Sequence, residues 1–337
     1  MDKQVLVVGW DGATESHLDE YDLEWYGGLD HGGVLLPEPF WQSREIDSGS
    51  AWTTLTTGLS TREHGVAMLS GLIEDERRFD LFSSVDRLIP RNLFGRPARI
   101  WARRQVLGRQ PTNDDVPYKR VWHYVPDSLA FAVPLTYPPK ETDGVTVSGF
   151  PSPEVSVQPA SLQEWVRERY DGEPSKFDDA GEIRDGYVED LFRTHEAERD
   201  LVLELVGREE FRLHFVVFTL LDRLLHVTDD AEVIERAYRT IDETSDRLVD
   251  AIDPDDVLVV SDHGMKHDPR GKWIHVHDET TGIWAGTRPW GVETHLDVTP
   301  ALVEYCGRYM GDPTYTAPET DAEREQMTSQ LRDLGYL

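Results

Sequence analysis

Carboxylates paired with imidazoles at two places in the chain are the feature best able to do chemistry. Asp222 and His226 stand four residues apart in VVFTLLDRLLHV, so a helix would present both side chains on one face. Asp262 and His263 are adjacent in VLVVSDHGM, where they follow a strand-like apolar run typical of a buried strand. Carboxylate oxygens and imidazole nitrogens are common ligands of transition metals. The four residues therefore look like half of a two-metal site.

Two further polar side chains follow similar signals near the N-terminus. Asp11 comes directly after the apolar run KQVLVVGW, so it would emerge past the carboxyl end of a buried strand, where open α/β sheets place their chemistry. Ser48 opens SGSAWTTLTTG, a run of small and helix-compatible residues closed by Gly58. At a helix N-terminus, unpaired amides and the helix dipole stabilise an anionic oxygen or a bound phosphate. Ser48 is the candidate nucleophile.

Three other hydroxyls compete with Ser48 in the same segment. They belong to Ser50, Thr53 and Thr54. Arg62 and Arg223 are weaker candidates for phosphate contacts, because a guanidinium offers two parallel donors.

These residues need a sheet to bring them together. Apolar runs near 4–9, 212–219 and 256–261 predict strands that serve one motif set, and VWHYV, LAFAV, VTVSGF and TGIWAG predict further short strands. A helix is expected over 231–251. We therefore predict a single α/β domain over 1–337, with cap-type insertions at approximately 71–118 and 150–210. The ending AEREQMTSQLRDLGYL has apolar positions at rough helical spacing and is expected to pack against the core.

The order of the motifs resembles the alkaline phosphatase superfamily, and within it the type I phosphodiesterase/nucleotide pyrophosphatase branch. The resemblance covers almost the whole chain. It implies an alkaline-phosphatase-like three-layer α/β/α sandwich with a mostly parallel central sheet. The segments that carry it are Asp11, Ser48 with Trp52 and Thr57-Gly58, Glu63-His64-Gly65, Asp222-x-x-x-His226, and Ser261-Asp262-His263-Gly264.

The resemblance also implies the metal ligands. One divalent ion would be held by Asp222, His226 and a later histidine, and the second by Asp11, Ser48, Asp262 and His263. Mixed carboxylate and imidazole ligands suit Zn²⁺ first and Mn²⁺ or Fe²⁺ next.

The later histidine has three candidates. His277 in HVHDETTGIWAG fits the family pattern best, because there a His precedes a Gly and then a strand. His275 and His295 are the alternatives.

The function implied is a metal-dependent phosphoric ester hydrolase, phosphodiesterase or nucleotide pyrophosphatase in type, acting through a phospho-enzyme intermediate on Ser48. The branch usually has an Asn downstream of His-Gly, and HGVAMLSG has none. A phosphomonoesterase or phosphoryl-transfer enzyme of the same superfamily is therefore an alternative, and a non-catalytic metal-binding protein is a second. A sulfatase is disfavoured, because the segment from Ser48 to Trp52 lacks the Pro and Arg of the formylglycine motif.

The composition restricts the partners. The 337 residues carry a formal net charge of −30, with only six lysines among 34 basic residues, which resembles halophilic archaeal proteins. Such a surface argues against binding of nucleic-acid polymers or anionic membranes. The family resemblance implies a small-molecule phosphate ester as the partner. No secretory or membrane-spanning segment is visible, so a cytoplasmic location is expected. Cys306 is the single cysteine, which excludes an intrachain disulfide and a thiolate cluster, and we expect it to be buried in a helix. No sequence pattern predicts an oligomeric state.

Overall fold

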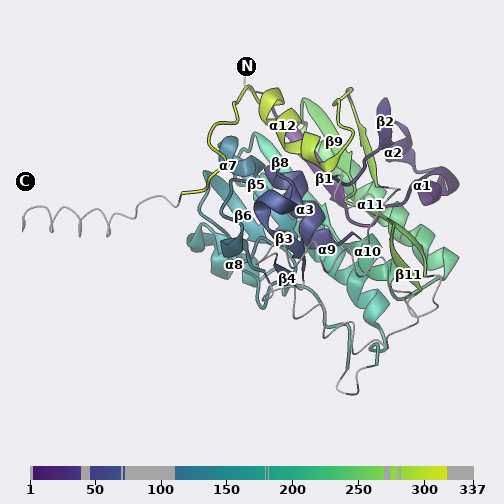
Figure 1. Cartoon of the computed structure of the whole chain (residues 1–337). Helices are drawn as coiled ribbons and strands as arrows, with labels where there is room; N and C mark the ends of the chain where they lie inside the picture. Colours follow the sequence, from purple (N-terminus) through teal and green to yellow (C-terminus); the bar gives the residue numbers. More distant parts are fainter. Residues whose placement is uncertain are drawn as a thin grey trace, which may run out of the picture.

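The computed structural model describes residues 3–38, 46–69, 71–72, 111–178, 180, 182–268, 274–278, 280 and 282–316. Its centre is an eight-stranded sheet in the order β2-β12-β9-β1-β8-β5-β6-β7 (Figure 1). The five strands from β9 to β6 are parallel to one another, whereas β2, β12 and β7 join antiparallel at the edges. The strands are β1 (Val5–Trp10), β2 (His31–Val34), β5 (Ser128–Val133), β6 (Gly144–Ser148), β7 (Val157–Gln158), β8 (Leu213–Phe218), β9 (Asp256–Val260) and β12 (Ile283–Gly286).

Helices cover both faces of this sheet, which is why the central strands are apolar throughout. Every residue of β1 is buried. Its side chains alternate between the two faces, with Leu6 and Val8 in one hydrophobic cluster and Val5 and Val7 in the other. The predicted three-layer fold with a mostly parallel sheet is confirmed.

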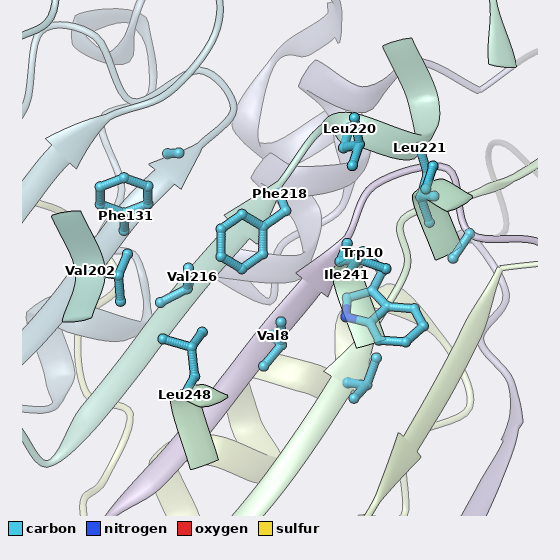
Figure 2. Close-up of a cluster of buried hydrophobic side chains, with 14 of the residues drawn as sticks. Val8, Trp10, Phe131, Val202, Val216, Phe218, Leu220, Leu221, Ile241 and Leu248 are labelled. Carbon is cyan, nitrogen blue, oxygen red and sulfur yellow. The ribbon is translucent and has the colours of Figure 1, made fainter. Parts of the chain in front are cut away.

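The first face is covered by two long helices from the second half of the chain, with shorter helices beside them. Figure 2 shows Val8 and Trp10 of β1 on this face of the sheet, together with Leu220, Ile241 and Leu248 from helices that pack on it. The amphipathic helix α11 packs its apolar stripe here, as expected for a helix with one face on a sheet. The helices of this layer are α1 (Glu15–Tyr21), α2 (Glu24–Gly27), α8 (Gln163–Arg167), α9 (Tyr187–Val206), α10 (Leu220–Leu225) and α11 (Ala231–Ile252).

The second face is covered by three shorter helices: α3 (Ser48–Thr57), α7 (Val121–Tyr124) and α12 (His295–Tyr305). Every residue of α3 is buried, because α12 packs over it. Cys306 lies at the C-terminal end of α12 and is buried.

The remaining elements are short. They are α4 (Thr61–His64), the two 3₁₀ turns Asn113–Asp115 and Ala160–Leu162, and two small antiparallel sheets, β3 (Val66–Met68) with β4 (Gly71–Leu72) and β10 (Gly264–His267) with β11 (His275–Asp278).

The prediction of one secondary-structure element is wrong. VWHYV was expected to be a strand, but Val121–Tyr124 form helix α7. The Arg120 amide donates to Nδ1 of His123 at 2.9 Å, which caps the first turn. The turn then buries Val121, Trp122 and Val125 together against the second face of the sheet. A short apolar run does not distinguish strand from helix by periodicity alone.

Two predicted segments lie largely or wholly outside the described residues. Of the insertion at 71–118, residues 73–110 fall there, and so does the whole ending 322–337. The segment 150–210 contains β7, α8 and α9, of which α9 contributes to the core of the first layer. None of the helices in the described ranges is long and apolar enough to cross a membrane.

Candidate active site

Three adjacent strands, β9, β1 and β8, end at the same edge of the sheet and deliver three carboxylates there. Asp11 follows β1, Asp262 follows β9, and Asp222 lies on α10, which begins directly after β8. The amide of Asp222 donates to the carbonyl of Asp11 at 3.0 Å. A side chain on Gly12, which has a φ of 79°, would come within 2.9 Å of the Asp222 Cα. The close approach of the two acidic segments therefore requires glycine.

The first group of possible metal ligands consists of Asp222, His226 and His277. Nε2 of each imidazole lies 3.3 Å from Oδ1 of Asp222, and the two Nε2 atoms are 3.2 Å apart. Nδ1 of His277 lies 2.8 Å from the Ile46 carbonyl, and Nδ1 of His226 lies 3.2 Å from the His275 carbonyl. Protons on the two Nδ1 atoms satisfy these carbonyls, so both Nε2 atoms are directed into the site.

The second group consists of Asp11, Asp262 and His263, and all three are buried. Nε2 of His263 lies 3.4 Å from Oδ2 of Asp262 and 3.7 Å from Oδ1 of Asp11. Its Nδ1 lies 3.0 Å from the Gly264 carbonyl, which again directs the Nε2 lone pair inward. The His263 ring stacks on His277 with centroids 3.9 Å apart, so the two groups are contiguous.

Ser48 stands against the second group. It is the first residue of α3, and its Oγ lies 3.0 Å from Nε2 of His263. Asp47 caps the helix, because its Oδ1 accepts from the amides of Gly49 at 3.0 Å and Leu69 at 2.7 Å.

The three competing hydroxyls bond elsewhere. Ser50 Oγ lies 3.0 Å from Thr61 Oγ1, Thr53 donates to the Gly49 carbonyl, and Thr54 lies 3.0 Å from Nε2 of His64. His64 also accepts the Val66 amide proton on Nδ1, so it orders the turn after α3 rather than entering the site.

Burial and the charges of neighbouring groups shift the pKa values of the three aspartates. Burial, with the charges of Asp262 and Asp222, raises the pKa of Asp11 well above its usual value. Burial and the Asp222 charge raise the pKa of Asp262 to about 7. Burial alone would raise the pKa of Asp222 as well, but His226 and then His277 hold it well below the usual value. A site with this excess of negative charge favours a cation.

The pKa values of His263 and His277 shift in opposite directions. Burial, followed by the charge of His277, lowers the pKa of His263 well below its usual value. Burial also disfavours charge on His277, but its contact with Asp222 raises its pKa to about 9.

Unpaired acceptors supply a test of whether the residues fit metal ions. Oδ1 of Asp11 and both carboxylate oxygens of Asp262 are buried and accept no hydrogen bond from the described residues. In each group, one ligand atom per residue lies within 4.8 Å of the others. Buried carboxylate oxygens without donors are costly unless they bind a cation, so the donor set fits divalent metals.

Only one of the three candidate histidines faces Asp222. His277 does so, as described above. His275 turns its Nδ1 to the Leu225 carbonyl at 2.9 Å and stacks on His267. His295 is buried at the start of α12.

The sequence matches a family model over most of its length. The model, described as type I phosphodiesterase/nucleotide pyrophosphatase, matches residues 6–299. The chain belongs to this family. It is thus a member of a family of phosphoric ester hydrolases, and the matched range contains every residue of the two groups and Ser48. A search of curated proteins finds no match.

Solved structures align with the chain at low sequence identity, and the first of the three below shows the same fold. The PH0037 protein of Pyrococcus horikoshii aligns with a TM-score of 0.51 and 12% identity, over 94% of this chain and 99% of that one. Murine ectonucleotide pyrophosphatase/phosphodiesterase 5 aligns with a TM-score of 0.48 and 12% identity, over 96% and 99%. The alkaline phosphatase of the Antarctic bacterium TAB5 aligns with a TM-score of 0.48 and 10% identity, over 92% and 99%.

Trp52 contacts the site, although the sequence predicts no role for it in this member of the phosphodiesterase family. Its indole Nε1 donates to Oδ2 of Asp11 at 2.9 Å. The available signal was its spacing, because Trp52 lies one helical turn after Ser48 and so shares its face of α3.

The two arginines differ in their placement. Arg62 lies exposed on α4. Arg223, next to Asp222, is mostly buried, and its Nε lies 3.1 Å from Thr219 Oγ1 and 3.3 Å from a carboxylate oxygen of Glu173. Its guanidinium lies over the Phe150 ring, 4.5 Å from the centroid.

Proposed function

We propose that this chain is a metal-dependent phosphodiesterase or nucleotide pyrophosphatase in which Ser48 is the nucleophile. The observation that carries the proposal is the 3.0 Å approach of Ser48 Oγ to His263 Nε2, at a helix N-terminus and beside two contiguous groups of carboxylates and imidazoles. Family membership supports the reaction class. The expected substrate is a small-molecule phosphate ester.

Two divalent ions would be held by the chain's own residues. Asp222, His226 and His277 would hold one ion, and Asp11, Ser48, Asp262 and His263 the other. When bound, such ions supply Lewis-acid chemistry: they neutralise charge on phosphoryl oxygens and make a nearby hydroxyl more acidic. The mixed oxygen and nitrogen donors favour Zn²⁺, then Mn²⁺ or Fe²⁺.

Ser48 would react in line with the leaving group. A bond forms between Ser48 Oγ and phosphorus while the bond from phosphorus to the ester oxygen breaks, leaving a phosphorylated Ser48. The hydroxyl proton passes to solvent, and the leaving group takes up a proton as it departs. Before an ion binds, His263 orients the serine, because its Nε2 lies 3.0 Å from Ser48 Oγ and can accept a hydrogen bond from the hydroxyl. The same lone pair would hold the ion once it is bound. The dipole of α3 stabilises negative charge at the same point. Water then attacks phosphorus from the side vacated by the leaving group. The bond from phosphorus to Ser48 Oγ breaks, a water proton is transferred to Ser48, and phosphate or its monoester is released.

Two substrates separate this proposal from its alternatives. The purified protein is assayed with Zn²⁺ or Mn²⁺ against bis-p-nitrophenyl phosphate and p-nitrophenyl phosphate. Diester turnover that is lost in Ser48→Ala and in Asp262→Ala supports the phosphodiesterase.

Turnover of the monoester alone would favour a phosphomonoesterase, the alternative suggested by the missing Asn in the segment after His64-Gly65. Metal binding without turnover of either substrate would favour a non-catalytic metal-binding protein.

A further inference from the structure

The indole of Trp52 occupies a position that is determined by close packing. It is fully buried, and its ring meets Phe215 edge to face with centroids 6.3 Å apart. A Cβ atom on Gly9 would lie 2.5 Å from the tip of the ring. Gly9 therefore makes room in β1 for the indole, and a bulkier residue there would displace it.

From this position the indole N–H holds one oxygen of Asp11. Oδ2 accepts from Trp52 Nε1 at 2.9 Å, whereas Oδ1 accepts no hydrogen bond from the described residues and faces His263. The indole nitrogen donates a hydrogen bond and has no acceptor lone pair, so it cannot itself be a metal ligand. The contact orients the carboxylate with one oxygen occupied and the other directed into the site.

The same contact ties Asp11 to the candidate nucleophile. Ser48 and Trp52 are one turn apart on α3, so a rotation or slide of the helix that moved Ser48 would also break the bond to Asp11.

We propose that Trp52 is a positioning residue that sets both the free oxygen of Asp11 and the register of the Ser48 helix against strand β1. The inference rests on the proposed function, because it assumes that Asp11 binds a metal ion. Groups that orient a metal ligand typically contribute tenfold to a hundredfold in metal affinity or activity.

The test compares two tryptophans that each donate one buried hydrogen bond. Trp52→Phe removes the donor to Asp11, and Trp290→Phe removes a 2.9 Å bond from Nε1 to the Val257 carbonyl, away from the site. Mn²⁺ and Zn²⁺ affinities of the full-length chain are measured by calorimetric titration, alongside thermal unfolding without metal. We expect Trp52→Phe to weaken metal binding by about tenfold to a hundredfold and Trp290→Phe to leave it unchanged.

A second variant guards against loss of folding. Replacing Trp52 by the isosteric amino acid 3-benzothienylalanine exchanges the N–H for sulfur and keeps the ring in its packed position. The Co²⁺-loaded protein then reports ligand geometry through its visible absorption spectrum. A changed spectrum and weaker affinity, with unfolding near that of the wild type, support the positioning role.

The outcomes also separate the inference from the proposed function. Suppose that the wild type turns over the diester and that the benzothienylalanine variant binds metal with unchanged affinity. This result would overturn the role of Trp52 and leave the proposed function standing. A wild-type chain that binds neither ion would overturn the proposed function, and the role of Trp52 with it.

Discussion

Ser48 Oγ and His263 Nε2 lie 3.0 Å apart although 215 positions separate them in the chain. One residue begins a helix on the second face of the sheet, and the other follows a central strand. The contact places a hydroxyl at a helix N-terminus beside the buried group of Asp11, Asp262 and His263, so several properties of the protein should depend on it.

Removal of the serine hydroxyl should abolish turnover. We expect Ser48→Ala to lower kcat for the diester by at least about a thousandfold, because no other hydroxyl of α3 faces the site. The measurement is a steady-state assay at saturating metal. Ser50→Ala is the matched control, since Ser50 bonds Thr61 instead, and it should keep its activity; activity retained in Ser48→Ala would show that another group attacks phosphorus.

The cap of the nucleophile helix should matter more for activity than an equivalent cap elsewhere. Asp47→Ala removes bonds to the amides of Gly49 and Leu69, and Asp230→Ala removes bonds to the amides of Glu232 and Val233 at the start of α11. Each should lower the free energy of unfolding by about 1 to 2 kcal/mol.

Only Asp47→Ala should also lower kcat, because it frees the first turn that carries Ser48. Denaturant unfolding and kinetics on both variants check this. Equal activities would show that the cap has no influence on the site.

Metal-free protein should lose stability as pH rises, through Asp262. Its pKa is about 7 in the fold against 3.8 ordinarily, so the folded state holds a proton that the unfolded state releases between those values. Its contribution therefore falls by about 1.4 kcal/mol per pH unit across that window. The difference in unfolding free energy between Asp262→Asn and wild type, measured in chelator, should increase from pH 4 to pH 7. Saturating metal should reverse the sign of this difference at pH 7, because only the wild type keeps the ligand.

A buried histidine outside the two ligand groups, His195, should lower stability as pH falls. His195 on α9 lies with Nε2 2.8 Å from Thr244 Oγ1, and burial lowers its pKa to about 3. The unfolded chain binds a proton that the fold excludes, so this stability is complete above pH 6.5 and is lost as pH falls toward 3. Relative to His195→Gln, the wild type should lose about 2 kcal/mol between pH 6.5 and pH 5, as chemical denaturation at each pH would measure. A flat difference for His195→Gln would mean that the ring is protonated in the fold.

The acidic surface should make stability depend on salt. With a formal net charge of −30, self-repulsion is screened by ions, so the midpoint of thermal unfolding should rise between low salt and about 2 M KCl. An uncharged osmolyte at equal osmolality is the control. The same rise with both additives would show that charge screening is not the cause.

Much of the site was predictable because its residues follow local signals. Asp11, Asp262 and His263 each come directly after an apolar run, and parallel strands end at one edge of a sheet. The helix Ser48–Thr57 and its stop at Gly58 follow from a capping Asp47 and a glycine in the left-handed region. The misassigned helix α7 shows the limit of such signals, since four apolar and aromatic residues are compatible with either structure.

The sequence by itself determined the class of the fold, the family, and which side chains could form the site, because strand ends, helix caps and i, i+4 spacing are local properties of the chain. The tertiary structure decided what each atom does. It selected His277 over His275 and His295 to face Asp222, it placed the Trp52 indole on one oxygen of Asp11, and it raised the pKa of one aspartate while lowering that of another. These outcomes depend on distances between groups far apart in the chain and on burial, and neither exists until the sheet and its two helical layers have packed.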